Sequence, residues 1–166
     1  MAKNDLTAQR LRELLQYDSK SGSLTWIERT SHRVKIGRTA GTVNGWGRMQ
    51  IGVLGHLYYA HRLAWLYSYG EWPTQVIDHI DGDPLNNRIT NLRDVPQEIN
   101  SQNTRIANAN NKSGLLGAFW HCQNKNWRAR IMVSGKSHSL GCFKTPEAAH
   151  EAYKQAKRRL HEGCTI

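Results

Sequence analysis

Residues 76–100 read VIDHIDGDPLNNRITNLRDVPQEIN, and this stretch contains the clearest structural and chemical signals in the chain. An apolar run leads into Asp78 and His79, and a turn rich in aspartate, glycine, proline and asparagine follows. A second short run over 92–95 ends at Pro96, a residue that suits the first position of a helix. The stretch therefore predicts a strand, a polar loop, a second strand and a helix, in that order.

Three side chains in this stretch suggest a chemical site. Asp78 and His79 can both reach one cleft if the strand ends at this pair, and Asn100 lies just over one turn into the predicted helix. Carboxylate and amide oxygens are ligands that suit Mg²⁺, and an imidazole can take a proton from water at neutral pH. Together these groups are typical of phosphodiester hydrolysis. The alternative is that Asp78 caps a turn, His79 packs in the core and the asparagines form a polar loop.

The distribution of charge around this stretch points to a polyanion as partner. The 166 residues contain 23 Lys and Arg against 13 Asp and Glu, a net charge of +10. Residues 1–77 carry 10 basic and 5 acidic side chains, residues 78–100 carry 2 and 5, and residues 101–166 carry 11 and 3. A short acidic segment between two basic flanks suits a cation site inside a nucleic-acid-binding surface. A generically basic surface is the alternative.

Composition also indicates the compartment. No stretch approaches the ~18 consecutive apolar residues of a membrane span. The beginning of the sequence has no apolar block typical of a signal peptide. The three cysteines form no C-x-x-C pair, so we expect free thiols and no structural zinc. These features predict a soluble protein without a membrane partner, located in the cytoplasm of a bacterial host if the gene belongs to a phage.

Outside the central stretch, the patterns predict two small α+β domains. Before it we expect a helix over 6–17, a strand over 23–27, a glycine-punctuated hairpin with one arm over 49–53, and a helix over 57–69. The polar segment 107–114 is the best domain boundary. Beyond it we expect strands over about 116–121, 127–133 and 137–140, and then a helix with Thr145 as its N-cap.

The run that begins with HRLAW at 61–65 and ends with Glu98-Ile99-Asn100 resembles the HNH endonuclease family, and in particular its phage and intron-associated homing branch. The resemblance covers about 61–103, or 23–103 with the preceding hairpin. It implies a ββα-metal motif that binds one divalent cation, Mg²⁺ or Mn²⁺, and cleaves or nicks DNA. It further implies that Asp78 and Asn100 are metal ligands, that His79 is the general base, and that Asn91 braces the loop and orients His79. The third motif position is Asn100 rather than histidine, which leaves the metal preference open.

Arg62 is the remaining catalytic candidate. It precedes the second predicted helix together with His61, and it is a candidate to hold the scissile phosphate. A purely structural role for this pair is the open alternative. Asp81 and Asp83 are expected to shape the turn.

Residues 113–161 are similar to the plant APETALA/ethylene-response-factor DNA-binding domain, through W-R-A-R-I at 127–131, L-G-C-F at 140–143 and A-A-H-E-A-Y at 148–153. The resemblance implies a three-stranded antiparallel sheet, backed by one helix, that lies in the major groove. Arg128 and Arg130 share one face of their strand and suit guanine edges and phosphates. Ala118 and Phe119 stand where the family often has an arginine-bearing strand. The other expected DNA contacts are Trp127, Trp120, Lys125, Lys136 and His138.

The sequence as a whole predicts an α+β protein with an HNH nuclease domain over 1–106, whose ββα-metal core covers about 75–106. A linker over 107–113 and a DNA-binding domain over 114–166 follow. The predicted function is metal-dependent hydrolysis of double-stranded DNA, without an organic cofactor or an obligatory protein partner. A non-catalytic, sequence-specific DNA-binding regulator built on a degenerate nuclease is the alternative.

Overall fold

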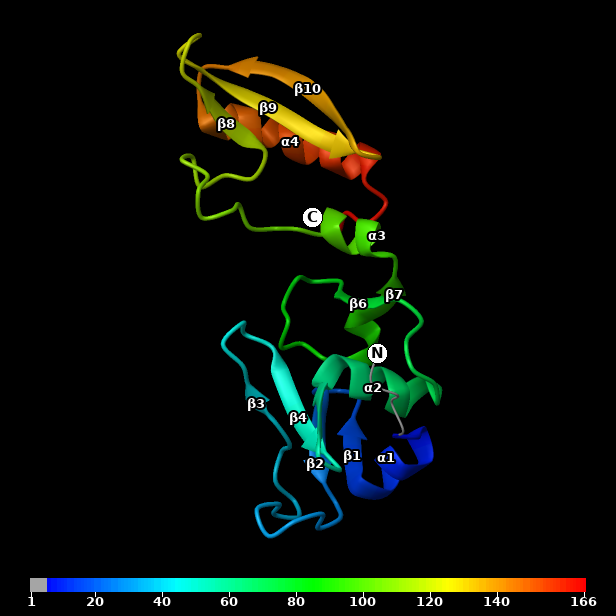
Figure 1. Ribbon diagram of the computed structural model, residues 1–166. Coiled ribbons are helices and arrows are strands. Elements are labelled where there is room, and N and C mark those ends of the chain that lie inside the picture. Colours follow the sequence, from blue (N-terminus) through cyan, green and yellow to red (C-terminus); the bar gives the residue numbers. More distant parts are fainter. Residues whose placement is uncertain (1–5) are drawn as a thin grey trace. The chain divides into compact units, whose positions relative to one another are not determined.

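The computed structural model describes residues 6–166, which form two compact units that divide after Pro96 (Figure 1). Each unit combines short antiparallel sheets with helices, so the predicted α+β class is confirmed. Among the residues described, no helix is long and apolar enough to span a membrane.

The first unit begins with helix α1 (Ala8–Leu14), which Thr7 caps by accepting a hydrogen bond from the Arg10 amide. The predicted helix over 6–17 is too long, because Leu15 adopts an extended conformation and starts strand β1 (Leu15–Asp18). This strand pairs with β2 (Ser23–Trp26). Leu14 and Leu15 are both fully buried, which the change from helix to strand at this point allows.

A three-stranded sheet and the second helix complete most of this unit. Strands β3 (Thr42–Val43), β4 (Met49–Val53) and β5 (His56–Tyr59) are antiparallel neighbours in that order. Helix α2 (Ala60–Tyr69) ends at Gly70, which adopts a left-handed conformation with φ of 85°. The predicted helix over 57–69 begins later than expected because its first residues pair with β4.

The central stretch forms the elements that its sequence predicts. Strand β6 (Val76–His79) pairs with β7 (Leu92–Val95), a 3₁₀ turn η1 (Ile89–Asn91) precedes β7, and helix α3 (Gln97–Gln102) follows Pro96. Ala64 of α2 packs with Ile77 and Leu92 in one small buried cluster. The α2 helix therefore supports the strand pair on which Asp78 and His79 lie.

The second unit contains the predicted three-stranded sheet and its helix. Strands β8 (Ala118–His121), β9 (Asn126–Val133) and β10 (Lys136–Phe143) are antiparallel with β9 in the centre. Helix α4 (Pro146–Leu160) packs on the sheet through buried alanines of β8, β9 and α4. Gly117 lies so close to Tyr153 of α4 that a Cβ atom would be 2.1 Å from the tyrosine ring. Small residues therefore allow the close approach of helix and sheet.

The division between the units falls after Pro96, ahead of the linker predicted over 107–113. Helix α3 belongs to the second unit because residues at its end bond to the segment that follows α4. The Gly163 amide donates to Gln102 Oε1 at 2.9 Å, and the Thr165 hydroxyl donates to Asn103 Oδ1. These partners are about 60 residues apart in sequence, so local sequence patterns contain no sign of them.

Candidate active site in the first unit

Asp78 and His79 are the last two residues of strand β6, and both are buried. The strand register places Asp78 opposite Arg93 and His79 opposite Leu92 of β7. Asp78 Oδ2 accepts hydrogen bonds from Arg93 Nε at 2.8 Å and from Nη2 at 2.7 Å. The guanidinium therefore fixes the carboxyl group in place, and its positive charge offsets the cost of burying that group.

Asn87 selects the tautomer of the neutral His79 ring. His79 Nε2 lies 3.1 Å from Asn87 Oδ1, while Asn87 Nδ2 donates to the Leu85 carbonyl at 3.3 Å. Because an amide oxygen only accepts hydrogen bonds, His79 Nε2 must carry the proton. In the neutral ring the lone pair then lies on Nδ1. The backbone carbonyl of Asn87 is itself held by the Tyr17 hydroxyl at 2.8 Å.

The surroundings of His79 favour the neutral ring. Burial lowers the pKa of its imidazole below the ordinary value, and the positive charge of Arg48 acts in the same direction. The bond to Asn87 and the charges of Asp81 and Asp78 oppose this decrease in pKa, but they do not cancel it. A histidine with a lowered pKa is unprotonated at neutral pH, which is the form that a general base requires.

His61, on α2, packs directly against His79. The two ring centroids are 5.1 Å apart and the rings are nearly perpendicular, and His61 also forms a parallel stack with Tyr59 at 5.3 Å. Burial lowers the pKa of His61 to about 3, and the charges of His79, Arg48 and Arg62 act in the same direction. The His61 ring is therefore neutral at neutral pH, and it packs against the candidate base as an aromatic ring.

Arg62, the predicted phosphate-binding residue, has a different neighbour. Its guanidinium lies over the Trp72 ring, 5.5 Å from the ring centroid. Successive residues on a helix point about 100° apart, so the helix directs His61 and Arg62 to different surroundings. Of this pair, the structure places His61 rather than Arg62 against His79.

Asn91 lies at the end of η1 and connects two parts of the loop between β6 and β7. Its Nδ2 donates to Asp81 Oδ1 and to the Asn86 carbonyl, both at 2.9 Å, and its Oδ1 accepts from the Asp81 amide at 3.0 Å. Three bonds from one buried side chain hold the loop closed. The side chain that bonds the His79 ring in the same loop is Asn87.

Asn87 and His61 are parts of the site that sequence reasoning missed. The signal for Asn87 is the Asn-Asn pair in the loop, which by itself indicates only a polar turn. The signal for His61 is its position at the start of a helix whose other residues are mostly apolar, where a buried imidazole needs a nearby polar or aromatic partner.

The donor chemistry at Asp78 fits a hard divalent cation. Among residues 6–166, no three His, Cys, Asp or Glu side chains cluster in a way that would hold a metal ion. Mg²⁺ does not require such a cage, because it keeps several waters and binds through one or two carboxylates and substrate phosphate oxygens. The single buried carboxylate of Asp78 matches this preference. Asn100, the predicted co-ligand, lies on α3 in the second unit.

The second unit presents its own candidate DNA surface. Arg128 and Arg130 are exposed on β9, and the residues that alternate with them, Ala129 and Ile131, are buried. The Arg130 guanidinium lies 4.7 Å from the centroid of the Phe119 ring on β8. This arginine face is hollowed by a cavity of about 360 Å³, lined by Phe119, Trp120, His121, Arg128, Ala129, Arg130, Ser137 and Ser139.

The other predicted DNA contacts lie elsewhere on this sheet. Trp120 and Trp127 pair across β8 and β9 with ring centroids 5.2 Å apart, on the side that α4 covers. The register of β10 places Lys136 and His138 on this same side, although both are exposed. Lys125 lies in the turn between β8 and β9, with φ of 50°. The two arginines therefore share their face with Phe119, and Trp120 also lines the cavity beside them. The register places Trp127, Lys136 and His138 on the other side of the sheet.

Comparison with known proteins identifies the class. A model of the HNH endonuclease family matches residues 58–102, a range that contains α2, both strands of the site and α3. The chain belongs to the HNH endonuclease family.

Two particular proteins are similar to it. Protein 3.8 of Escherichia phage T7 is 34% identical over 102 residues, which cover 61% of this chain and 83% of the phage protein. Among solved structures, that of the HNH homing endonuclease I-HmuI, which concerns DNA binding and cleavage by that enzyme, matches with a TM-score of 0.43 and 22% identity. The match covers 90% of this chain and 88% of the I-HmuI chain.

Proposed function

We propose that this protein is a metal-dependent endonuclease that hydrolyses phosphodiester bonds of double-stranded DNA. The observation that carries the proposal is the arrangement of Asp78, His79 and Asn87. It consists of a neutral, buried imidazole whose tautomer is fixed by an amide oxygen, next to a buried carboxylate. Membership of the HNH endonuclease family supports the same reaction.

Each residue in this proposal has a separate role. His79 Nδ1 accepts the proton of the attacking water, and Asn87 holds the ring in the form that can do so. Asp78 and Asn100 would hold the divalent cation, Mg²⁺ or Mn²⁺. When bound, the cation supplies Lewis-acid stabilisation of the charge that develops on the phosphate. Asn91 keeps the loop closed around Asn87.

Arg48 is a second cation that we assign to the scissile phosphate, beside the predicted Arg62. It is exposed just before β4, and its guanidinium lies 5.9 Å from the centroid of Tyr59, the ring on which His61 stacks. Its positive charge acts on both His61 and His79. An exposed arginine whose charge acts on the candidate base is suited to hold a phosphate oxygen.

In this proposal the second unit binds the DNA duplex through its arginine face. Arg128 and Arg130 project from the exposed side of the sheet, and a β-sheet of this kind fits the width of the major groove. The similarity to the APETALA/ethylene-response-factor domain supports the same surface. Binding by the second unit and cleavage by the first are then separate tasks of one chain.

The experiment that tests the activity uses a pool of supercoiled plasmids with random inserts, so that a rare recognition site is represented. Wild-type protein and His79→Ala are incubated with Mg²⁺, with Mn²⁺ or with EDTA. His32→Ala is the matched control, because His32 is an exposed histidine of the same unit. We expect metal-dependent nicked or linear DNA, a loss of roughly 10²- to 10⁴-fold in rate for His79→Ala, and no change for His32→Ala.

Two results would reject the proposal. Cleavage that survives in His79→Ala at the wild-type rate would remove the assigned base. Plasmid that is bound by the wild-type protein but stays intact under all metal conditions would favour the regulator built on a degenerate nuclease.

A further inference from the structure

Helix α3 has little support of its own. It contains six residues, Gln97–Gln102, and none of them is buried. A helix this short is not stable by itself in water, because one or two turns do not repay the cost of nucleation. The proposed metal ligand Asn100 lies on this helix, so whatever holds α3 also fixes the position of that ligand.

The segment 161–165, which follows α4, supplies contacts that hold α3. The Gly163 amide donates to Gln102 Oε1 at 2.9 Å. The Thr165 hydroxyl donates to Asn103 Oδ1, and Arg105 Nη2 donates to the Thr165 carbonyl at 3.1 Å. We call residues 161–165 the strap.

Gly163 shows how closely the strap approaches the helix. A Cβ atom at this position would lie 2.2 Å from the Ile99 carbonyl oxygen and 3.0 Å from Gln102 Cβ. Its φ lies outside the left-handed region, so glycine is needed here for space rather than for an unusual backbone conformation. The backbone of the strap is therefore in direct contact with the backbone of α3.

The other end of the strap is anchored to the sheet. His161 Nε2 donates to the Met132 carbonyl of β9 at 2.7 Å. Just before the strap, the ammonium of the buried Lys157 donates to the Thr104 carbonyl. The strap and the last turns of α4 thus connect the DNA-binding sheet to the residues that end α3.

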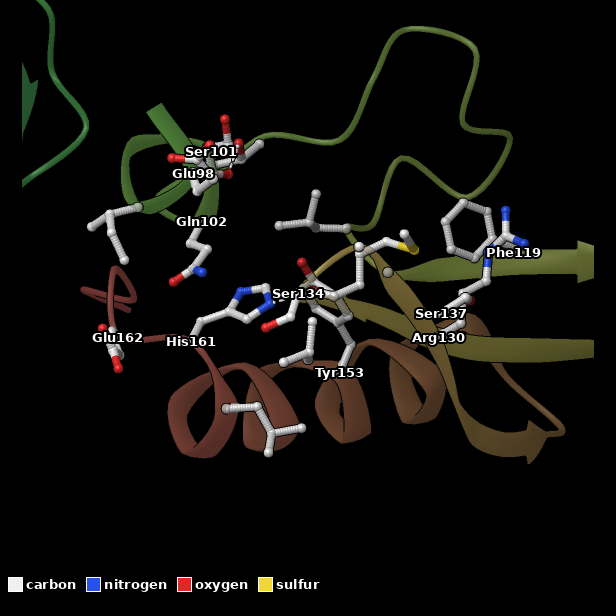
Figure 2. Close-up of a pocket in the computed structure, with 18 residues that line it drawn as sticks. Glu98, Ser101, Gln102, Phe119, Arg130, Ser134, Ser137, Tyr153, His161 and Glu162 are labelled. Carbon is white, nitrogen blue, oxygen red and sulfur yellow. Dashed lines mark hydrogen bonds between the residues drawn. The ribbon is translucent and has the colours of Figure 1, made fainter. Parts of the chain in front are cut away.

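A cavity separates α3 from the sheet beside the strap. Figure 2 shows Gln102 extending from α3 toward the side of the cavity on which His161 lies, with Tyr153 of α4 on the opposite wall from α3. The cavity has a volume of about 820 Å³, and α3, the β9–β10 hairpin and α4 all line it. Because this space lies between helix and sheet, packing on the sheet does not fix α3, and the contacts of the strap take that role.

We propose that the strap is a positioning element for Asn100: it fixes the helix that carries this ligand to the sheet that binds DNA. The inference rests on the proposed nuclease function. Gly163 and Thr165 are positioning residues in this scheme, since they act through α3 and touch neither substrate nor metal. In this proposal, cation affinity depends on residues that follow α4.

The test compares Thr165→Val with Thr165→Ser. Valine has nearly the shape of threonine but lacks the hydroxyl that bonds Asn103, whereas serine keeps it. Hydrogen–deuterium exchange of the amides over 97–103 is measured in the full-length protein without metal. Plasmid cleavage is then measured across a Mg²⁺ titration, and DNA affinity in EDTA. Valine loses both the bond that the hydroxyl donates to Asn103 Oδ1 and the bond that it accepts from Arg105 Nη2. We therefore expect Thr165→Val to exchange faster and to need roughly 10- to 30-fold more Mg²⁺ for half-maximal cleavage, the factor for two lost hydrogen bonds. Thr165→Ser should match the wild type in all three measurements.

A second pair of variants tests the close contact. Gly163→Ala places a methyl group against the Ile99 carbonyl, and Gly52→Ala adds the same group where nothing lies within 4 Å. We expect only the first to raise the Mg²⁺ requirement, with DNA affinity unchanged in both. Unaltered exchange in Thr165→Val, or faster exchange with an unaltered Mg²⁺ midpoint, would overturn the inference. A wild-type protein that does not cleave at all would instead reject the proposed function, and the exchange data would still decide whether the strap holds α3.

Discussion

Asn87 determines the chemistry of His79 through a single contact, the bond between its amide oxygen and Nε2. Without this acceptor the neutral ring can place its proton on either nitrogen, and the fraction with a lone pair on Nδ1 falls. We therefore expect Asn87→Ala to reduce the cleavage rate about tenfold, part of the contribution of a general base. DNA affinity in EDTA should stay at the wild-type level.

Asn86→Ala is the matched control for this prediction. Asn86 is the preceding residue and bonds Asp81 Oδ2 through its side chain, so its loss perturbs the same loop at a different contact. Equal rates for Asn86→Ala and Asn87→Ala would show that loop integrity, rather than the tautomer of His79, limits the reaction.

The lowered pKa of His61 leads to a prediction about how the free energy of unfolding depends on pH. Its pKa is about 3 in the folded protein, against an ordinary value of 6.5 in the unfolded chain. Between these two pH values the unfolded state binds a proton that the folded state does not. The contribution of His61 to the free energy of unfolding is therefore fully present above pH 6.5 and is lost as the pH falls toward 3. The contribution is about 1.4 kcal/mol per pH unit.

The measurement is the free energy of unfolding in urea at a series of pH values for wild type and His61→Phe. Phenylalanine keeps an aromatic ring between Tyr59 and His79 but does not titrate. The difference between the two proteins should grow in favour of the variant as the pH falls below 6.5. Parallel curves for the two proteins would contradict the assigned pKa.

At the scale of elements, the loop between β6 and β7 depends on Asn91. Its buried side chain bonds both Asp81 and the Asn86 carbonyl, and alanine would leave these partners unsatisfied. We expect Asn91→Ala to lower the free energy of unfolding by about 1–3 kcal/mol, measured by urea denaturation. Thr90→Ala, at the exposed neighbouring position, should change it little. A loss of the same size in both variants would show that the hydrogen bonds of Asn91 do not stabilise the loop.

Local patterns predict the positions of most elements because the residues that begin and end those elements lie in one short segment. The run into Asp78, the polar turn and Pro96 each belong to one short segment, and β6, β7 and α3 form where they indicate. The predicted end of the first helix is wrong because pairing of Leu15 with Trp26, a partner 11 residues away, overrides helix periodicity.

The site is predictable only in part for the same reason. Asp78 and His79 share a strand end that the sequence marks directly. The contact of His61 with His79 and the burial of Lys157 depend on tertiary packing between distant segments. No local periodicity distinguishes a lysine that bonds the Thr104 carbonyl from one on a solvated helix face.

At the scale of the whole molecule, net charge is divided unevenly. Residues 1–96 contain 12 basic and 9 acidic side chains, a net +3, and residues 97–166 contain 11 and 4, a net +7. Counterion release makes the DNA affinity of such a protein fall with salt, by a slope close to one per phosphate contact. We infer that the second unit supplies the larger part of this slope, through its arginine face.

The double variant Arg128→Ala/Arg130→Ala tests whether the arginine face supplies most of the salt dependence. Removing two phosphate or base contacts should reduce the slope of log affinity against log salt by about 2, and it should weaken binding at every salt concentration. Lys154→Ala/Arg159→Ala removes the same charge from α4, on the other side of the sheet, and should leave the slope nearly unchanged. Fluorescence anisotropy with a labelled duplex in EDTA gives both values. Equal changes of slope in the two double variants would mean that net charge alone, rather than the arginine face, governs DNA binding.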